Sequence, residues 1–227
     1  MRDYQIIDVC HTIEAGMITY RGLPGPVITD HLSRERSREF YSPGTEFHIG
    51  KIEMVANTGT YLDSPFHRYE HGTDLAGLDL YSLANLDAIV IRRHRDAPRG
   101  IALSELEDRD VRGKAVLFQT DWDWHWRTDK YWNGQHPFLT TETAQHLVSN
   151  GAALVGIDSY NIDDTTTGER PVHSLLLANE IPIVEHLCGL RELPSGDFRF
   201  FAVPAKIRNF GTFPVRAFAV VASKDQN

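Results

Sequence analysis

The sequence contains little cysteine and no long hydrophobic run. Its two cysteines, Cys10 and Cys188, form no C-x-x-C pair, so we expect two reduced thiols and not a disulfide framework. No apolar stretch approaches the ~20 residues that a membrane-spanning helix needs. The N-terminus lacks a basic segment followed by an apolar run, so no signal peptide is expected. These absences predict a soluble, cytoplasmic protein without a membrane partner.

A surplus of basic residues is also missing. The chain carries 31 acidic against 23 basic residues, a net charge of −8. Nucleic acids and anionic membranes are usually met by a basic face, so this balance disfavours both as partners. The hydrophobic fraction of 41% is ordinary for a globular protein, and 227 residues can bury a core without disulfides or structural metal.

Strand and helix patterns alternate along much of the chain, and no Ser/Gly/Pro-rich linker divides it. We therefore expect one domain, 1–227, of mixed α/β class. Runs of β-branched and aromatic residues predict strands at 4–9, 51–55, 88–93, 114–120, 152–158, 181–185, 198–205 and 213–222. Helices are predicted at 104–109, from the capping-box spacing of Ser104 and Glu107, at 141–149, and at 171–180.

The first candidate for chemistry is the segment "NTGTYLDSPFH". Asp63 and His67 are separated by Pro65, so they should lie on a stiff loop and not on a helix face. Gly59 would allow the backbone to approach a ligand closely. One interpretation is a metal or catalytic loop. The alternative is a structural turn in which the Asp caps backbone amides and the His lies on the surface.

The second candidate is the segment "GIDSYNIDDTTTGERPVHSLLLANEIPIVEHL". Asp158 ends a predicted strand, where α/β proteins place binding groups, although capping of the next turn is an equal alternative. Asp163 and Asp164 are expected to be solvated. His173 lies in a predicted helix, and Glu185 ends an apolar strand. A buried carboxylate there needs a partner: a metal, a histidine or an arginine.

The third candidate is "DWDWHWRTDKYW", which contains all four tryptophans. As core it would be unusual, because Asp, Arg and Lys alternate with the rings. We favour a loop lining a pocket for a flat aromatic substrate, with Trp122, Trp124 and Phe66 as contacts. A subunit interface is the alternative, since Trp and Tyr are enriched there too.

Taken together, these segments resemble the metal-dependent cyclase family, which includes bacterial kynurenine formamidase and isatin hydrolase. Its signature reads His-x-Gly-Thr-His-x-Asp-x-Pro-x-His, and "GTYLDSPFH" matches its core. "IIDVCHTI" is similar to the opening strand of the family, "GIDSYNID" to its middle, and "VHSLLLANEIPIVEHLCGL" to a late helix-strand unit. The resemblance runs in order from about residue 4 to about residue 222.

The resemblance implies a compact mixed-sheet domain of the swivelling β/β/α type, assembled as a homodimer or homotetramer. It further implies hydrolysis of a C–N bond with a divalent metal such as Zn or Mn. Carried over by position, Asp63, His173 and Glu185 match metal ligands, and His67 matches a proton-shuttling histidine. His11 matches the histidine of the opening strand, for which no role is assigned.

Two positions depart from the signature. Asn57 and Tyr61 stand where the family has histidines. An amide oxygen is a weak, hard ligand, and a phenol with a pKa of about 10 is a poorer one still. A second metal is therefore not expected. A single metal held by Asp63, His173 and Glu185 still meets the three-ligand count of a catalytic zinc site.

Three functions remain open on the sequence. The first is an arylformamidase-like hydrolase, of the kind used in tryptophan catabolism, that acts on a small, aromatic amide, formamide or lactone through a metal-activated water. Asn57, Tyr61 and Asp158 would then contact substrate, and His67 would move the proton. The second is a metal-independent cyclase, dehydratase or isomerase using Tyr61, Asp63 and His67. The third is a non-catalytic small-molecule-binding homologue.

Overall fold

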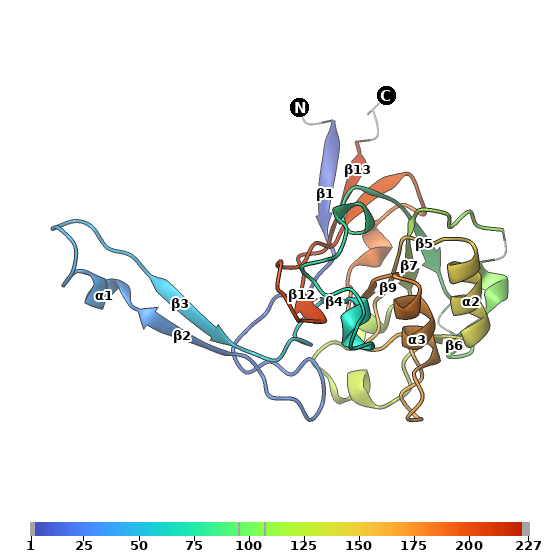
Figure 1. Cartoon of the computed structure of the whole chain (residues 1–227), viewed down its shortest axis with the longest axis horizontal. Coiled ribbons are helices and arrows are strands. Elements are labelled where there is room, and N and C mark those ends of the chain that lie inside the picture. Colours follow the sequence, from blue (N-terminus) through green and yellow to red (C-terminus); the bar gives the residue numbers. More distant parts are fainter. Residues whose placement is uncertain (1–2, 95, 107, 224–227) are drawn as a thin grey trace.

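A nine-stranded mixed sheet forms the body of the protein (Figure 1). The computed structural model describes residues 3–94, 96–106 and 108–223. The elements in chain order are β1 (Tyr4–Asp8), β2 (Val27–Leu32), α1 (Arg34–Ser37), β3 (Ile49–Glu53), β4 (Tyr61–Asp63), β5 (Leu86–Arg92), β6 (Gly100–Ile101), β7 (Ala115–Gln119), β8 (Phe138–Leu139), α2 (Thr141–Ser149), β9 (Leu154–Ile157), α3 (Pro171–Ala178), β10 (Ile183–Glu185), β11 (Phe198–Phe201), β12 (Thr212–Pro214) and β13 (Phe218–Ala222).

The order of strands in the sheet is β1-β13-β11-β5-β7-β9-β10-β4-β12. β5, β7, β9 and β10 pair in parallel, and the flanking strands pair antiparallel. This curled mixed sheet confirms the predicted mixed α/β fold. None of the described helices is long and apolar enough to cross a membrane.

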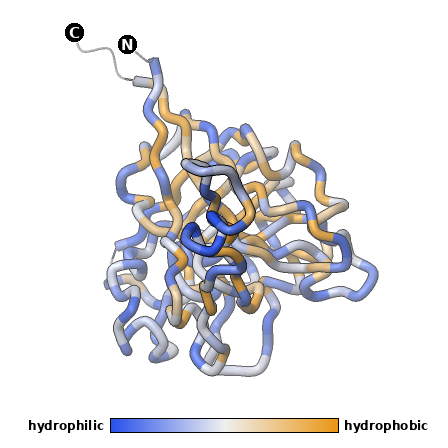
Figure 2. The backbone as a smooth tube through the Cα atoms, turned by 90° about the vertical axis from the view of Figure 1, so that its left-hand side faces the viewer, coloured by the Kyte–Doolittle hydropathy of each residue, from blue (hydrophilic) through white to orange (hydrophobic). Residues whose placement is uncertain are grey.

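The central parallel strands are apolar on both faces because both faces are covered. In β7, Leu117 packs into one buried cluster and its neighbours Val116 and Phe118 into another. Side chains alternate between the faces of a strand, so these clusters are the two cores of the sheet. α2 and α3 contribute Leu147 and Leu176 to the second core. Figure 2 shows the hydrophobic segments gathered in the body and hydrophilic ones in the outer loops.

The helix predictions are confirmed for α2 and, from its start at Pro171, for α3. The helix predicted at 104–109 is wrong: a 3₁₀ turn occupies Leu103–Glu105, and Glu107 lies outside the described residues. There the Glu105 carboxylate accepts a hydrogen bond from the Ala102 backbone N–H at 3.2 Å. Glu105, two positions before the residue expected to form the capping box, therefore caps a short 3₁₀ turn.

Some strand predictions also need correction. The single strand predicted at 213–222 is two strands: β12 is an edge strand beside β4, whereas β13 lies near the other edge of the sheet. Pro214 is compatible with β12 because an edge strand has one side free of ladder bonds. β4 falls in the stretch predicted to be a loop, and β2 was not predicted at all.

A long hairpin extends away from the body (Figure 1). We call this hairpin, residues 27–53, the arm. Its strands β2 and β3 pair only with each other, and almost every residue in them is exposed. The exposed apolar side chains of the arm are Val27, Ile28, Phe40, Tyr41, Phe47, Ile49 and Ile52. An isolated two-stranded hairpin is only marginally stable in water, so the arm is expected to be covered by another surface.

Two histidines, one half-buried and one buried, lie within a cluster of aromatic rings on the body. The His11 ring stacks on Trp126 with centroids 3.9 Å apart, and the His136 ring lies 4.1 Å from that of Tyr160. Burial, the largest cause in both, lowers the pKa of His11 and of His136 to about 4. Both rings are therefore neutral in the folded protein at neutral pH.

These two histidines should make stability fall on acidification. The unfolded chain, with histidine pKa values of about 6.5, binds more protons than the folded chain between pH ~6.5 and ~4. The contribution of these two histidines to the free energy of unfolding is then fully present above pH ~6.5, and it is lost as the pH falls toward 4. We expect the urea midpoint to drop across this window, and to drop less in His136→Gln. The same pH dependence in His136→Gln would contradict this assignment.

Candidate metal centre and its cavity

A cavity of about 1050 Å³ opens beside β4, β10 and the start of α3. Five of the predicted site residues line it: Asn57, Tyr61, His67, His173 and Glu185. Asp63 is fully buried next to them. Segments more than a hundred residues apart in the sequence thus meet at one place.

The sheet register explains how the acidic residues meet. β4 and β10 are antiparallel neighbours, with Asp63 opposite Ile183 and Tyr61 opposite Glu185. Residues two apart on a strand share a face, so Tyr61 and Asp63 point the same way and Glu185 lies beside them. The 3₁₀ turn Pro65–His67 then carries the His67 ring back over Asp63.

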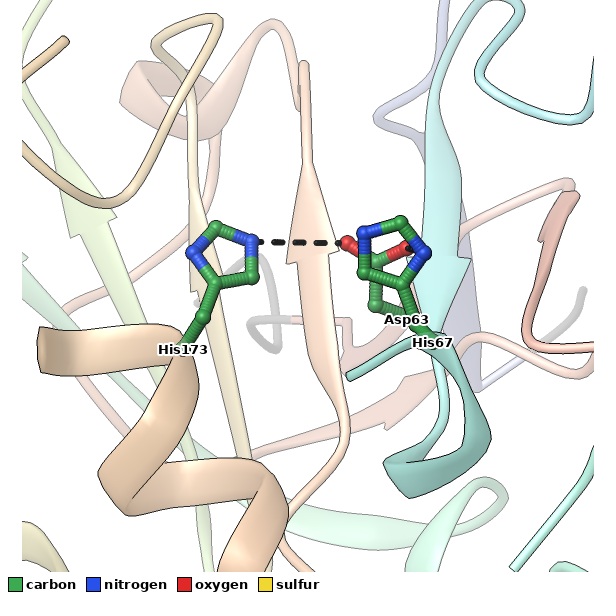
Figure 3. A group of neighbouring side chains, drawn as sticks. All are labelled: Asp63, His67 and His173. Carbon is green, nitrogen blue, oxygen red and sulfur yellow. Dashed lines mark ion pairs between the residues drawn. The ribbon is translucent and has the colours of Figure 1, made fainter. Parts of the chain in front are cut away.

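Two imidazoles face the Asp63 carboxylate from different elements (Figure 3). His67 Nδ1 lies 3.7 Å from Asp63 Oδ1, and His173 Nε2 lies 3.7 Å from Asp63 Oδ2. Ligating atoms of all three residues lie within 4.8 Å of one another. His173 Nε2 is also 3.6 Å from Glu185 Oε1. Such spacings leave room for a small cation between the side chains.

The donor atoms fit a divalent metal. Asp63 Oδ2 is buried and has no hydrogen-bond partner among the described residues. An uncompensated carboxylate oxygen is costly in the interior, and a cation would compensate it. The Nδ1 atom of His173 is engaged by Asp163 Oδ2 at 2.6 Å, which leaves Nε2 to face Asp63. Imidazole and carboxylate together suit zinc or manganese.

Charge within the cluster is balanced by His173. Burial acts to lower the pKa of His173, but the Glu185, Asp163 and Asp63 carboxylates outweigh it and raise that pKa to about 10. Burial likewise acts to raise the pKa of Asp63, but His67 and His173 hold it below its usual range. Without a metal, His173 therefore carries the positive charge that the carboxylates require. A bound cation would take over that charge and displace the proton.

Asp163 is a correction to the sequence analysis, which placed it in solvent. Its carboxylate is fully buried, accepts hydrogen bonds from the backbone N–H groups of Val172 and His173 at 2.8 and 3.0 Å, and orients the His173 ring. Asp164 is partly exposed and pairs with Arg99 at 2.8 Å. No spacing rule distinguishes these two adjacent acids, because a loop folds Asp163 back onto the first turn of α3.

Thr212 on β12 is a further residue that the sequence did not indicate. Its hydroxyl donates to Asp63 Oδ1 and lies 2.8 Å from His67 Nδ1. The hydroxyl thus links the carboxylate to the half-exposed histidine. β12 pairs with β4 so that Thr212 is opposite Asp63, a register that only the folded sheet reveals.

Tyr61 and Asn57, which stand where the family signature has histidines, have different surroundings in the structure. The Tyr61 hydroxyl donates to Glu185 Oε2 at 2.8 Å, and the Ile162 N–H donates to Glu185 Oε1 at 2.6 Å. Burial, and next the Glu185 charge, raise the pKa of Tyr61 well above its usual value, so the phenol stays protonated. Tyr61 therefore serves as the buried partner that the Glu185 carboxylate requires. Asn57 lines the same cavity.

Four predicted substrate contacts lie elsewhere: Phe66, Trp122, Trp124 and Asp158 are not among the residues lining this cavity. Asp158 accepts hydrogen bonds from the backbone N–H groups of Thr120 and Asp121, in the turn after β7 and not in the turn that follows Asp158 itself. Trp122 is buried and Trp124 is about half exposed, packed against the Arg191 guanidinium. These four side chains therefore lie outside the lining of this cavity.

The sequence profile of the Cyclase family matches residues 7–164. The chain belongs to the Cyclase family. Relatives of this Cyclase-family protein include the kynurenine formamidase of Geobacillus thermodenitrificans, 31% identical over 74% of this chain and 78% of the relative. The kynurenine formamidase of Bacillus cytotoxicus is 29% identical over 74% and 78% of the two chains.

Solved structures share the fold of this Cyclase-family protein. A potential metal-dependent hydrolase with cyclase activity superposes with a TM-score of 0.78 at 22% identity, covering 97% of this chain and all of the other. An isatin hydrolase bound to the product analogue thioisatinate superposes with a TM-score of 0.80 at 20% identity, covering 97% and 94%. At these identities the likeness establishes the curled mixed fold.

Proposed function

We propose that this Cyclase-family protein hydrolyses a C–N amide or formamide bond of a small aromatic substrate, with one divalent metal. The coarser conclusion, a hydrolase of C–N bonds, follows from its kynurenine formamidase relatives. The proposal of a metal-dependent amide hydrolase rests on one observation. Asp63 Oδ2 is buried without a hydrogen-bond partner among the described residues, and it faces His173 Nε2 beside a large cavity.

Asp63 and His173 would hold the metal, with Glu185 Oε1 as the third ligand. When bound, a divalent ion polarises a carbonyl and lowers the pKa of a water from ~16 to about 7. Other side chains of the protein position these ligands. Tyr61 fixes the Glu185 carboxylate, Asp163 fixes the His173 ring, and the cavity admits the substrate.

His67 is proposed to carry the proton to the leaving nitrogen. Its ring lines the cavity, about a third of its side chain is exposed, and Thr212 and Asp63 contact it from the buried side. A histidine in this position can reach both the interior cluster and a molecule in the cavity. A side chain that only held the metal would not need that exposure.

Replacing His67 distinguishes a role in proton transfer from a role in metal binding. In His67→Gln we expect turnover of a formanilide substrate to fall roughly 10²- to 10⁴-fold, the usual contribution of general acid–base catalysis, while metal content is retained. His71→Gln, an exposed histidine four residues away, is the matched control and should keep both. Loss of the metal in His67→Gln would make His67 a ligand instead.

We also propose that the protein is a homo-oligomer in which the arm packs against a second copy. The arm exposes seven large apolar side chains, and its strands β2 and β3 pair with each other and not with the nine-stranded sheet. Because such a hairpin must be covered whenever the chain folds, the partner must be present in equal amount, and another copy of the chain meets that condition.

Polar substitutions on the arm should dissociate the oligomer. Phe40→Ser combined with Ile52→Ser removes two side chains that are 64% and 56% exposed in the single chain. We expect sedimentation velocity to show a dimer or tetramer for the wild type and a shift to monomer for this variant at micromolar concentration. Tyr81→Ser, 88% exposed on the body, is the control. A monomeric wild-type protein would contradict the proposal.

A further inference from the structure

The cavity is lined by a second phenol, that of Tyr20, in addition to Tyr61. The Tyr61 hydroxyl is already engaged, because it donates to Glu185 Oε2 at 2.8 Å. The Tyr20 hydroxyl accepts a hydrogen bond from Asn161 Nδ2 at 3.3 Å, and among the described residues no acceptor lies at hydrogen-bond distance for its own proton. Tyr20 therefore has a donor free for a molecule in the cavity.

The direction of the hydrogen bond between Asn161 and Tyr20 is set by the backbone. Asn161 Oδ1 accepts from the Asp163 N–H at 3.0 Å, so the amide nitrogen and not the amide oxygen faces Tyr20. An amide NH₂ group can only donate. The Tyr20 oxygen must therefore accept on this side, and its hydrogen is left for an acceptor elsewhere.

Two further contacts hold Tyr20 in place. The preceding residue, Thr19, is buried, and its Oγ1 accepts from the Gly59 N–H at 2.7 Å, which ties this segment to the loop before β4. The Tyr20 ring meets the Tyr160 ring edge to face, with centroids 5.9 Å apart. A donor fixed in advance needs no reorganisation when charge develops next to it, so it stabilises that charge more than a mobile side chain does.

Tyr20 and His67 approach the cluster from the sides of different carboxylates. His67 Nδ1 lies 3.7 Å from Asp63 Oδ1. Burial, and next the Glu185 charge, raise the pKa of Tyr20 to about 12, so the phenol lies near Glu185 and keeps its proton at neutral pH. An amide bound with its nitrogen at His67 would therefore present its carbonyl oxygen toward Tyr20.

From this arrangement we infer that Tyr20 is a catalytic residue whose hydroxyl donates a hydrogen bond to the carbonyl oxygen of the scissile amide. The inference rests on the proposed function and adds a residue to it. As the oxygen of a water bonds to the carbonyl carbon, the π electrons of the C=O bond move onto the carbonyl oxygen, and Tyr20 stabilises this charge while keeping its own proton. The electrons then return as the C–N bond breaks. The proton lost by the water reaches the leaving nitrogen through His67, and the products are a carboxylic acid and an amine.

Tyr20→Phe removes the hydroxyl and retains the ring. In the full-length, metal-loaded protein we expect kcat for formanilide to fall roughly 10²- to 10³-fold, the usual loss for one such donor, with metal content unchanged. Tyr160→Phe is the matched control and should keep wild-type turnover, because the Tyr160 hydroxyl bonds to Thr165 Oγ1 at 2.7 Å and Tyr160 does not line the cavity. A wild-type kcat in Tyr20→Phe would overturn the inference and leave formamide hydrolysis intact.

A thioamide substrate distinguishes a hydrogen bond to the carbonyl from a disturbed loop. Sulfur is a weaker hydrogen-bond acceptor than oxygen, so the loss in Tyr20→Phe should be clearly smaller for thioformanilide than for formanilide. Any effect of sulfur on the metal is common to both proteins and cancels in the ratio of their rates. The same fold-loss with both substrates would show that Tyr20 acts only on the structure of the site.

A binding measurement separates this inference from the proposed function. If no formamide is turned over, the proposed function fails, and calorimetry with benzamide then tests the donor. We expect benzamide to bind the wild type roughly 2- to 10-fold more tightly than Tyr20→Phe at equal metal content, the range for one neutral hydrogen bond. Equal affinities, or no binding of benzamide to either protein, would contradict a carbonyl-binding role for Tyr20.

Discussion

Asp63→Asn should remove the metal and lower turnover by at least about a thousandfold. Asp63 faces both histidines of the cluster, and its Oδ2 is the buried oxygen without a partner. An amide has the same shape but no charge, so it cannot balance a divalent ion. Metal-ion catalysis supplies several kcal/mol of transition-state stabilisation, and each 1.36 kcal/mol is about tenfold in rate.

Metal content by elemental analysis and kcat with a formanilide substrate check this prediction together. Asp87→Asn is a suitable control because Asp87 lies on β5, is largely exposed and pairs with Arg199 on the surface. Thermal unfolding should show that Asp63→Asn remains folded, since its shape is preserved. A folded Asp63→Asn variant with wild-type turnover would rule out a metal held by this carboxylate.

Asp163→Asn should weaken metal binding roughly 10- to 100-fold without touching a ligand atom. Partners that hold the second nitrogen of a ligating histidine typically contribute that much to affinity or activity. Asp163 Oδ2 lies 2.6 Å from His173 Nδ1 and fixes the ring so that Nε2 faces Asp63. The amide group introduced by this substitution would hold the ring less firmly and no longer favour its ligating form.

The neighbouring acid supplies a matched control. Asp164→Asn has the same chemistry one position later, but Asp164 is partly exposed, pairs with Arg99 and does not contact His173. Competition with a fluorescent zinc chelator should separate the two variants. Equal metal affinity in Asp163→Asn and Asp164→Asn would show that the buried carboxylate has no positioning role.

Much of the body could be predicted from the sequence because its strands bury both faces. β5, β7, β9 and β10 are short apolar runs with turn residues at their ends, and α2 and α3 carry their own start signals. The arm was predicted only in part: the strand expected at 51–55 overlaps β3, whereas β2 was not expected. Both strands bury almost nothing within the chain, so their pattern has no core face to reveal it.

The side chains of the candidate site could be predicted from the sequence, but the residues that position them could not. Asp63, His67, His173 and Glu185 were indicated by the family signature and by the cost of burying a carboxylate. Asp163 and Thr212 reach the site only through a folded-back loop and through the pairing of β12 with β4. Those contacts depend on tertiary register, which no local spacing records.

The tryptophan-rich segment shows the limit of arguments from composition. Its alternation with charged residues suggested a pocket wall, yet Trp126 and Trp132 pack against Tyr131 and Tyr160 in a buried cluster. Among the charged residues interleaved with them, Asp123 is buried and pairs with Arg191 at 2.6 Å. Aromatic enrichment therefore marked a structural cluster beside the cavity.

The most direct test of the metal centre is anomalous scattering from crystals of the protein purified without chelator, measured at the zinc and manganese edges. We expect one peak, within ligand distance of Asp63 and His173, and no second peak beside Asn57. Crystals without an anomalous peak, from a preparation whose turnover survives EDTA, would contradict the metal centre and favour acid–base chemistry by Tyr61, Asp63 and His67 alone.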